Sequence, residues 1–416
     1  MSRRSQIPRL TRSPLWPFAI LAAIYLFLLT VLVPWWMDNN LLKGDGAGHL
    51  FLVEFTSQHL LPFGAGWCDR VWGGFAVGQL YPPLFHILGG ALAKLTGAMV
   101  AVKILVTLTW LLIPVGLYLI AGTLAAASDP GRARPLLHGA LLLAGWCGLA
   151  LPSELLGIKE TLGTNLESAI GNGMFPSAAG CAAWLLCTAA LLRRDHRRPA
   201  AIAAPLALTV LLHPVWGLVA AATCAVAAAS AILTPPPGES RIRVLVGWGI
   251  AGLLAFALSA FFALPFLVNA GQVHTTHIPL RWPAALWWLV AATAGLALLH
   301  WRRLPQKLRV VAATTGLLIT CAGLGDAASL TFHFYRLTLP VSLLALTLLT
   351  YLLYQPWSTT DDTLRDSTNP SRLAVLLRVA NFLMLLTLAA IFHTQGPVYP
   401  RGNPALSSAN LPGISR

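Results

Sequence analysis

Long runs of apolar residues recur along almost the whole chain, and they constrain its fold more than any other feature. A membrane-spanning helix needs about 20 mainly apolar residues, because the hydrocarbon core of a bilayer is about 30 Å thick. Backbone groups in lipid must also satisfy their own hydrogen bonds, which favours helices. Eleven candidate spans lie at about residues 17–37, 100–122, 136–152, 174–192, 200–213, 216–233, 243–268, 283–301, 309–325, 337–355 and 373–393. We therefore predict an all-α polytopic membrane protein with one transmembrane domain over residues 1–416 and no large soluble domain.

Two stretches need separate interpretation. Residues 200–233 are too long for one span, and we divide them at His213-Pro214, because proline breaks or kinks a helix. Residues 81–97 begin with Tyr-Pro-Pro and are interrupted by two glycines and a lysine. This stretch is either a twelfth span or a re-entrant or interfacial helix, and we favour the second interpretation on the distribution of charge.

The basic residues are spread over one side of the predicted bundle. Only 10% of the residues are charged, yet the net charge is +14, against about 25% charged residues in an ordinary soluble domain. If residues 81–97 do not cross, 18 of the 28 Lys and Arg fall in six segments, namely the N-terminus, 123–135, 193–199, 234–243, 302–309 and 356–372. Such loops are typical of the cytoplasmic side. The charge therefore indicates membrane orientation and predicts no nucleic-acid partner.

This orientation assigns the ends and the long loops. Residues 1–16 form a basic cytoplasmic tail, residues 38–80 a long extracytoplasmic loop with short helices, and residues 394–416 an extracytoplasmic tail. Eight of the fourteen acidic residues lie on the outer side. We therefore expect a multi-pass membrane protein with a cytoplasmic N-terminus whose activity faces outward.

The first outer loop carries the residues best suited to catalysis. Asp45 and His49 lie four positions apart in Gly-Asp-Gly-Ala-Gly-His, so they share a face if a helix begins there. An Asp–His pair suits general-base work. The alternative is structural: Asp45 could instead cap the helix by accepting hydrogen bonds from its first N–H groups.

Other polar residues near span ends are candidates for substrate binding. Arg336 lies beside His333 at the outer end of the 337–355 span, where its guanidinium fork suits a phosphate. Snorkelling to the lipid headgroups, or a structural pair with Asp326, are the alternatives for Arg336. The remaining candidates are Asp69, Arg70, Tyr81 and His213. Asp69-Arg70 could equally be a local ion pair, and His213 a satisfied histidine at a helix end.

Metal-binding patterns are weak. His274 and His277 lie three positions apart, but two histidines alone do not define a zinc site. No cysteine spacing supports a zinc site or a disulfide framework. The identity of any metal ligand stays open from the residues alone.

These motifs resemble a family. Gly-Asp-Gly-x-x-His after the first span, followed by Tyr-Pro-Pro-Leu-Phe, resembles the GT-C superfamily of integral-membrane glycosyltransferases. More closely, it resembles the bacterial and archaeal membrane proteins related to 6-pyruvoyl-tetrahydropterin synthase. Three later segments fit the resemblance, namely Gly-Asn-Gly-Met-Phe-Pro at 171–176, Leu-His-Pro at 212–214 and His-Phe-Tyr-Arg at 333–336.

The resemblance implies a function and a site. A sugar would pass from a polyprenyl-phosphate carrier to an acceptor on the outer face, with Asp45 as base or metal ligand and Arg336 on the lipid phosphate. A divalent cation, Mg²⁺ or Mn²⁺, would assist. A second acidic motif and the family's soluble C-terminal domain are not evident, which favours as an alternative a non-catalytic subunit with a partner in an envelope or polysaccharide assembly complex. A lipid or solute transporter is the third interpretation.

Overall fold

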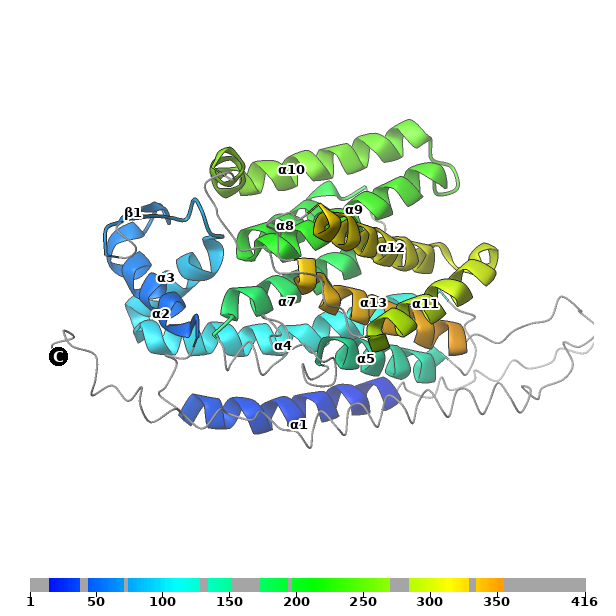
Figure 1. Ribbon diagram of the computed structural model, residues 1–416, viewed down its shortest axis with the longest axis horizontal. Helices are drawn as coiled ribbons and strands as arrows, with labels where there is room; N and C mark the ends of the chain where they lie inside the picture. The colour runs from blue at the N-terminus through cyan, green and yellow to red at the C-terminus, as the bar shows by residue number, and fades with distance from the viewer. Residues whose placement is uncertain are drawn as a thin grey trace, which may run out of the picture.

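The computed structural model describes residues 15–37, 44–70, 74–127, 134–150, 173–193, 197–269, 284–328 and 334–354. Helices dominate these residues and lie side by side in a bundle (Figure 1). The α-helices are α1 (Leu15–Met37), α2 (Gly46–Phe55), α3 (Leu84–Thr96), α4 (Ala98–Ala125), α5 (Arg134–Ala150), α7 (Phe175–Arg193), α8 (Pro199–Leu212), α9 (Pro214–Leu233), α10 (Arg241–Val268), α11 (Ala284–Leu299), α12 (Gln306–Ala327) and α13 (Thr338–Tyr354). Shorter elements are the π-helical turn η1 (Thr56–Leu60), the 3₁₀ turns η3 (Trp301–Arg303) and η4 (Phe334–Leu337), and the strands β1 (Gly66–Cys68) and β2 (Phe75–Val77).

Six of the described helices are long and apolar enough to cross a membrane: α1, α4, α7, α9, α10 and α12. They coincide with six of the eleven predicted spans. Four other predicted spans are the shorter helices α5, α8, α11 and α13, and the run at 373–393 lies outside the described residues. A 14-residue helix such as α8 is only about 21 Å long at about 1.5 Å per residue. The membrane character is therefore supported, and the count of eleven spans is not confirmed.

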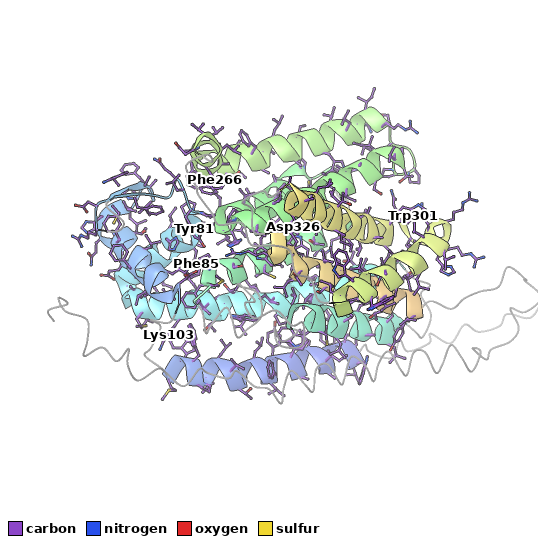
Figure 2. The ribbon with its side chains drawn as sticks, in the orientation of Figure 1. Tyr81, Phe85, Lys103, Phe266, Trp301 and Asp326 are labelled. Carbon is purple, nitrogen blue, oxygen red and sulfur yellow. The ribbon has the colours of Figure 1, made fainter. Side chains whose placement is uncertain are left out.

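Helices α1 and α4 are joined by polar contacts near one end of the bundle. The Nζ of Lys103 donates to the carbonyl of Trp36 at 2.7 Å, and the indole of Trp36 donates to Thr107 at 2.8 Å. Figure 2 labels Lys103 where α1 and α4 approach each other. The end of α1 thus lies beside the start of α4.

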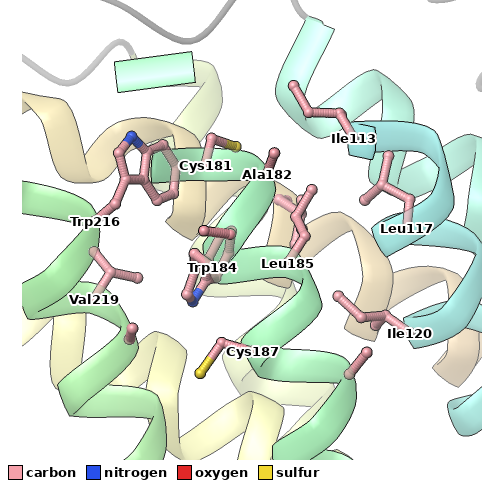
Figure 3. Close-up of a cluster of buried hydrophobic side chains, with 14 of the residues drawn as sticks. Ile113, Leu117, Ile120, Cys181, Ala182, Trp184, Leu185, Cys187, Trp216 and Val219 are labelled. Carbon is pink, nitrogen blue, oxygen red and sulfur yellow. The ribbon is translucent and has the colours of Figure 1, made fainter. Parts of the chain in front are cut away.

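The core of the bundle is built from α4, α7 and α9. Trp184 of α7 and Trp216 of α9 are buried with their ring centroids 5.1 Å apart, while Leu117 of α4 packs from the other side (Figure 3). The side chains of α7 are buried on all sides along most of its length. A helix that is apolar all round must be surrounded by other helices or by lipid, and here α7 occupies the centre of the bundle.

The predicted outer loop forms a small layer at the same end of the bundle as the start of α4 (Figure 1). It contains α2, η1 and a two-stranded antiparallel sheet in which Trp67 pairs with Ala76 and Cys68 with Phe75, and α3 of the following stretch packs against it. The all-α prediction therefore needs one correction. Trp, Cys, Phe and Val are compatible with strands, and the hairpin buries Cys68 and Val77 beneath it.

The length of helix α3 bears on whether residues 81–97 cross the membrane. Its 13 residues span about 20 Å, which is too short for a hydrocarbon core of about 30 Å. Gly97, with φ of 80°, then reverses the chain directly into α4. Residues 81–97 thus do not form a helix long enough to cross, in line with the favoured interpretation.

The break predicted at His213-Pro214 is present. Helix α8 ends at Leu212 and α9 begins at Pro214, while His213 itself is extended, with φ of −161° and ψ of 131°. A residue before proline is sterically pushed out of the helical region. The extended residue turns the imidazole of His213 away from both helix surfaces and into the protein, where it is buried.

Candidate functional site

Asp45 stands immediately before α2 with its side chain exposed. Its backbone carbonyl accepts a hydrogen bond from the N–H of His49 at 3.0 Å, which closes the first helical turn. The carboxylate, however, makes no capping hydrogen bond. The capping interpretation of Asp45 is therefore wrong for this conformation, and the carboxylate remains available to a ligand.

His49 and His86 form a buried pair between α2 and α3. The Nδ1 of His49 lies 3.1 Å from the Nε2 of His86, and the two residues are 8% and 3% exposed. Burial disfavours the charged imidazolium. It lowers the pKa of His49 from 6.5 to about 4 and holds the pKa of His86 well below its ordinary value. Both rings are therefore neutral at pH 7.

Aromatic rings surround His49. The centroids of Tyr81, Phe175 and Phe85 lie 5.9, 6.2 and 6.3 Å from the His49 ring. Figure 2 shows Tyr81 and Phe85 at the end of the bundle where α3 lies. Two segments that are far apart in the sequence, 81–85 and the start of α7, thus enclose one imidazole, and this enclosure is what removes it from water.

Gly173 allows the start of α7 to reach this group. Its φ is +69°, and a Cβ at this position would lie 2.0 Å from the backbone nitrogen of Gly46. Only glycine combines this left-handed conformation with so close an approach. The contact places Phe175, two residues later, against the His49 ring.

Tyr81 lies in the electrostatic environment of both Asp45 and Arg336. Burial raises the pKa of its hydroxyl, so Tyr81 is an un-ionised phenol. Tyr81 precedes Pro82 and Pro83, whose restricted backbones determine how the chain turns into α3. The phenol therefore lies within reach of a ligand that contacts both charges.

Arg336 and His213 form the opposite side of the site. The Nη1 of Arg336 lies 3.4 Å from the Nε2 of His213, and His213 also interacts electrostatically with His49. Within the described residues, the buried Nε of Arg336 and the buried Nδ1 of His213 have no hydrogen-bond partner. Buried N–H groups without partners are costly, so this pair presents unused donors that suit an anion.

The structure thus brings together five of the eight predicted site residues: Asp45, His49, Tyr81, His213 and Arg336. Asp69 and Arg70 lie exposed in the bend after β1, and within the described ranges they take no part in the contacts that join the site. His333 lies outside the described residues. His86 was missed, because its only signal in the sequence is a histidine one turn after Tyr-Pro-Pro, and nothing local indicates that it faces His49.

The described residues alone do not form a metal site. Among them, no group of three or more His, Cys, Asp or Glu is placed to hold a metal ion. Asp45 is the carboxylate identified at the site, whereas Mg²⁺ and Mn²⁺ prefer several oxygen ligands. The pair His274 and His277 lies outside the described residues.

Comparison with solved structures identifies the architecture. The chain is similar to the oligosaccharyltransferase of Archaeoglobus fulgidus, solved with a tethered acceptor peptide that contains the NVT sequon. The TM-score is 0.51 at 14% sequence identity, over 92% of this chain and 55% of that enzyme. The fold is of the GT-C type.

The GT-C-like fold gives the observed site a context without naming a substrate. By sequence, no protein family and no curated protein matches the chain. The chain spans about half the length of the oligosaccharyltransferase. The shared architecture therefore supports the expectation of a GT-C-like fold, whereas the relation to the pterin-synthase-related proteins is not shown.

Proposed function

We propose that the protein is a membrane glycosyltransferase that moves a sugar from a polyprenyl-phosphate carrier to an acceptor at the outer face. The observation that carries the proposal is the electrostatic interaction of Tyr81 with both Asp45 and Arg336 in a GT-C-like bundle. A transfer of this kind needs a proton acceptor beside the nucleophile and a cation beside the leaving group. The two charged groups supply these separately.

The proposed reaction is a single displacement at the anomeric carbon. The hydroxyl or amide of the sugar-accepting substrate gives its proton to Asp45, and its oxygen or nitrogen forms a bond to C1 of the sugar. The bond between C1 and the phosphate oxygen breaks, and the lipid phosphate keeps the electron pair. Arg336 stabilises this leaving charge, which grows toward the transition state.

The donor lipid is proposed from the position of the site. Two helices long enough to span the membrane, α7 and α9, begin beside it, so we place the isoprenoid tail in lipid and its phosphate at the guanidinium of Arg336. An arginine fork binds phosphate oxygens in a bidentate manner. Among the described residues the Nε of Arg336 has no partner and is one such donor. The imidazole of His213 lies beside the guanidinium.

Three further elements belong to the proposal. The first is a location in the bacterial inner membrane with a cytoplasmic N-terminus. The second is kinship with the pterin-synthase-related membrane proteins. The third is a divalent cation, Mg²⁺ or Mn²⁺, which would need carboxylates in addition to Asp45, so the step written above does not use one.

The decisive test is Asp45→Asn, assayed with membranes and polyprenyl-phosphate-linked sugars. We expect at least a ~10²-fold loss of transfer, because a positioned proton acceptor contributes about 10²- to 10⁴-fold. Abundance in the membrane should not change, since Asp45 makes no capping bond. The matched control is Glu54→Gln, an exposed carboxyl on the same helix that is hydrogen-bonded to Gln58.

Three outcomes contradict the proposal. Full transfer by Asp45→Asn excludes Asp45 as the base. An unmodified protein that transfers no sugar but co-purifies with a stoichiometric membrane partner identifies a non-catalytic subunit instead, and solute uptake by proteoliposomes without transfer identifies a transporter.

A further inference from the structure

The proposed reaction leaves the buried pair of His49 and His86 without an assigned role. Besides its contact with His49, the imidazole of His86 interacts with the backbone of Pro82 in a way that favours an N–H on the ring. Proline has no N–H, so the group concerned is the carbonyl of Pro82, and the imidazole nitrogen that faces this carbonyl carries the proton.

The proton position on His86 also determines which nitrogen of His49 carries a proton. The Nε2 of His86 faces His49, so the nitrogen that faces the carbonyl of Pro82 is Nδ1. A neutral imidazole has one N–H and one lone pair, and the Nε2 of His86 must therefore accept. Consequently the Nδ1 of His49 donates to it, and the Nε2 of His49 carries a lone pair.

We propose that His86 is a positioning residue that holds the Nε2 of His49 as a hydrogen-bond acceptor for the O–H or N–H of the sugar-accepting substrate. The proposal rests on the proposed function for the identity of that substrate. His49 is more exposed than His86, at 8% against 3%, as expected if His49 faces the ligand and His86 supports it from behind. The carbonyl of Pro82 thus sets the tautomer of His86, and His86 in turn sets the tautomer of His49.

The arrangement divides the site by hydrogen-bonding character. The carboxylate of Asp45 and the Nε2 of His49 accept hydrogen bonds, whereas the guanidinium of Arg336 only donates them. A phosphate needs donors and is repelled by lone pairs, and a nucleophilic hydroxyl or amide needs acceptors. The two substrates therefore bind at different positions, with the nucleophile toward α2 and the phosphate toward η4.

The first experiment measures the tautomer directly. Protein labelled with ¹⁵N-histidine is purified in detergent, and the His49 signals are assigned by their loss in His49→Gln. We expect His49 at pH 7 to carry its proton on Nδ1. His86→Gln retains a side-chain oxygen that can accept the hydrogen bond from the Nδ1 of His49, so it should keep this tautomer. His86→Leu has no acceptor, so the proton of His49 should no longer be confined to Nδ1. A proton found on the Nε2 of His49 in the unmodified protein overturns the proposal.

The second experiment measures transfer. His86→Leu should lower kcat by about 10- to 100-fold, as observed for outer partners of functional histidines, with KM for the lipid donor unchanged. His86→Gln should restore most of kcat. The control is His138→Leu in α5, which removes a histidine hydrogen-bonded to the carbonyl of Tyr118 and should leave the His49 tautomer and the rate unchanged.

The outcomes separate the two claims. If His86→Leu transfers sugar as fast as the unmodified protein, or if His86→Gln is as slow as His86→Leu, the positioning role is wrong. If the unmodified protein transfers no sugar, the proposed function and the substrate contact of His49 fall together. The tautomer is still decided by the spectra, including in the case that His86→Leu does not accumulate.

Discussion

At the residue scale, the site is defined by the different environments of similar groups. His49 and His86 are buried and neutral, while the carboxylate of Asp45 is exposed. Arg336 meets an imidazole through one nitrogen, and among the described residues its Nε has no hydrogen-bond partner. The burial of His49 and the free guanidinium nitrogen each lead to a prediction.

The first prediction concerns pH. Because the folded-state pKa of His49 is about 4 against an ordinary value of 6.5, the unfolded chain binds more protons between these values. The contribution of neutral His49 to the free energy of unfolding is complete above about pH 6.5. It is lost as pH falls from there through about 4, by up to about 3 kcal/mol. Melting temperatures in detergent from pH 4 to 8 should therefore fall below pH 6.5.

The double variant His49→Gln/His86→Gln provides the comparison. It should show a shallower fall in melting temperature between pH 6.5 and 4, because the groups that must take up protons are gone. His59→Gln, which removes an exposed imidazole on η1, should retain the steep fall. Equal slopes for all three proteins would assign the acid sensitivity to other groups.

The second prediction concerns the phosphate. Arg336→Lys replaces a planar fork by a point charge and should weaken binding of a short-chain polyprenyl phosphate by at least about tenfold, since hydrogen bonds to charged groups contribute about 1.5–3 kcal/mol. Titration calorimetry in detergent measures the affinity. Arg309→Lys is the control, because Arg309 donates to the carbonyls of Trp301 and Arg302 instead; an equal loss in both variants would argue against a specific phosphate contact.

At the element scale, the site depends on α2, α3, η4 and the start of α7 meeting at one end of the bundle. The helices themselves are predictable, because apolar run length and proline position act locally. Their contacts are not. The hairpin β1–β2 and the approach of Gly173 to Gly46 arise from packing between segments, and local patterns carry no information about which segments meet.

Gly173→Ala tests the element contact. A Cβ would lie 2.0 Å from the nitrogen of Gly46, at a residue with φ of +69°, so we expect a loss of about 1–3 kcal/mol and displacement of α2 with loss of sugar transfer. The matched variant is Gly48→Ala, where a Cβ meets nothing within 4 Å and helix propensity favours alanine. Thermal unfolding of both proteins in detergent compares them, and equal stability would show that α2 and residue 173 are not in contact.

At the scale of the whole molecule, the fold divides the bundle into a chemically mixed end and a basic end. The layer with α2, α3 and the hairpin lies at the first end. The α7–α8 and α9–α10 connections, tied by the ion pair of Arg197 with Glu239, join helices at their other ends. The distribution of Lys and Arg predicts that the basic end is cytoplasmic.

Cysteine labelling tests this orientation. Phe63→Cys, at an 85% exposed position beside the hairpin, should react with a membrane-impermeant maleimide in intact spheroplasts. Pro237→Cys, in the exposed α9–α10 connection, should react only after permeabilisation. The unmodified protein measures background from the native cysteines, and the reverse labelling pattern would invert the topology and move the site to the cytoplasmic face.

The sequence by itself determined that this is a helical membrane protein and where its main helices lie, and it predicted eight candidate site residues, of which Asp45, His49, Tyr81, His213 and Arg336 form one group in the structure. These conclusions depend on composition and spacing along the chain, which burial in lipid constrains directly. Only the tertiary structure decided that Asp45 does not cap α2, that His213 stands beside Arg336, and that His86 lies against His49. Such pairings join residues 37 to 123 positions apart, and the physical reason is that side-chain partners are chosen by the packing of helices against one another.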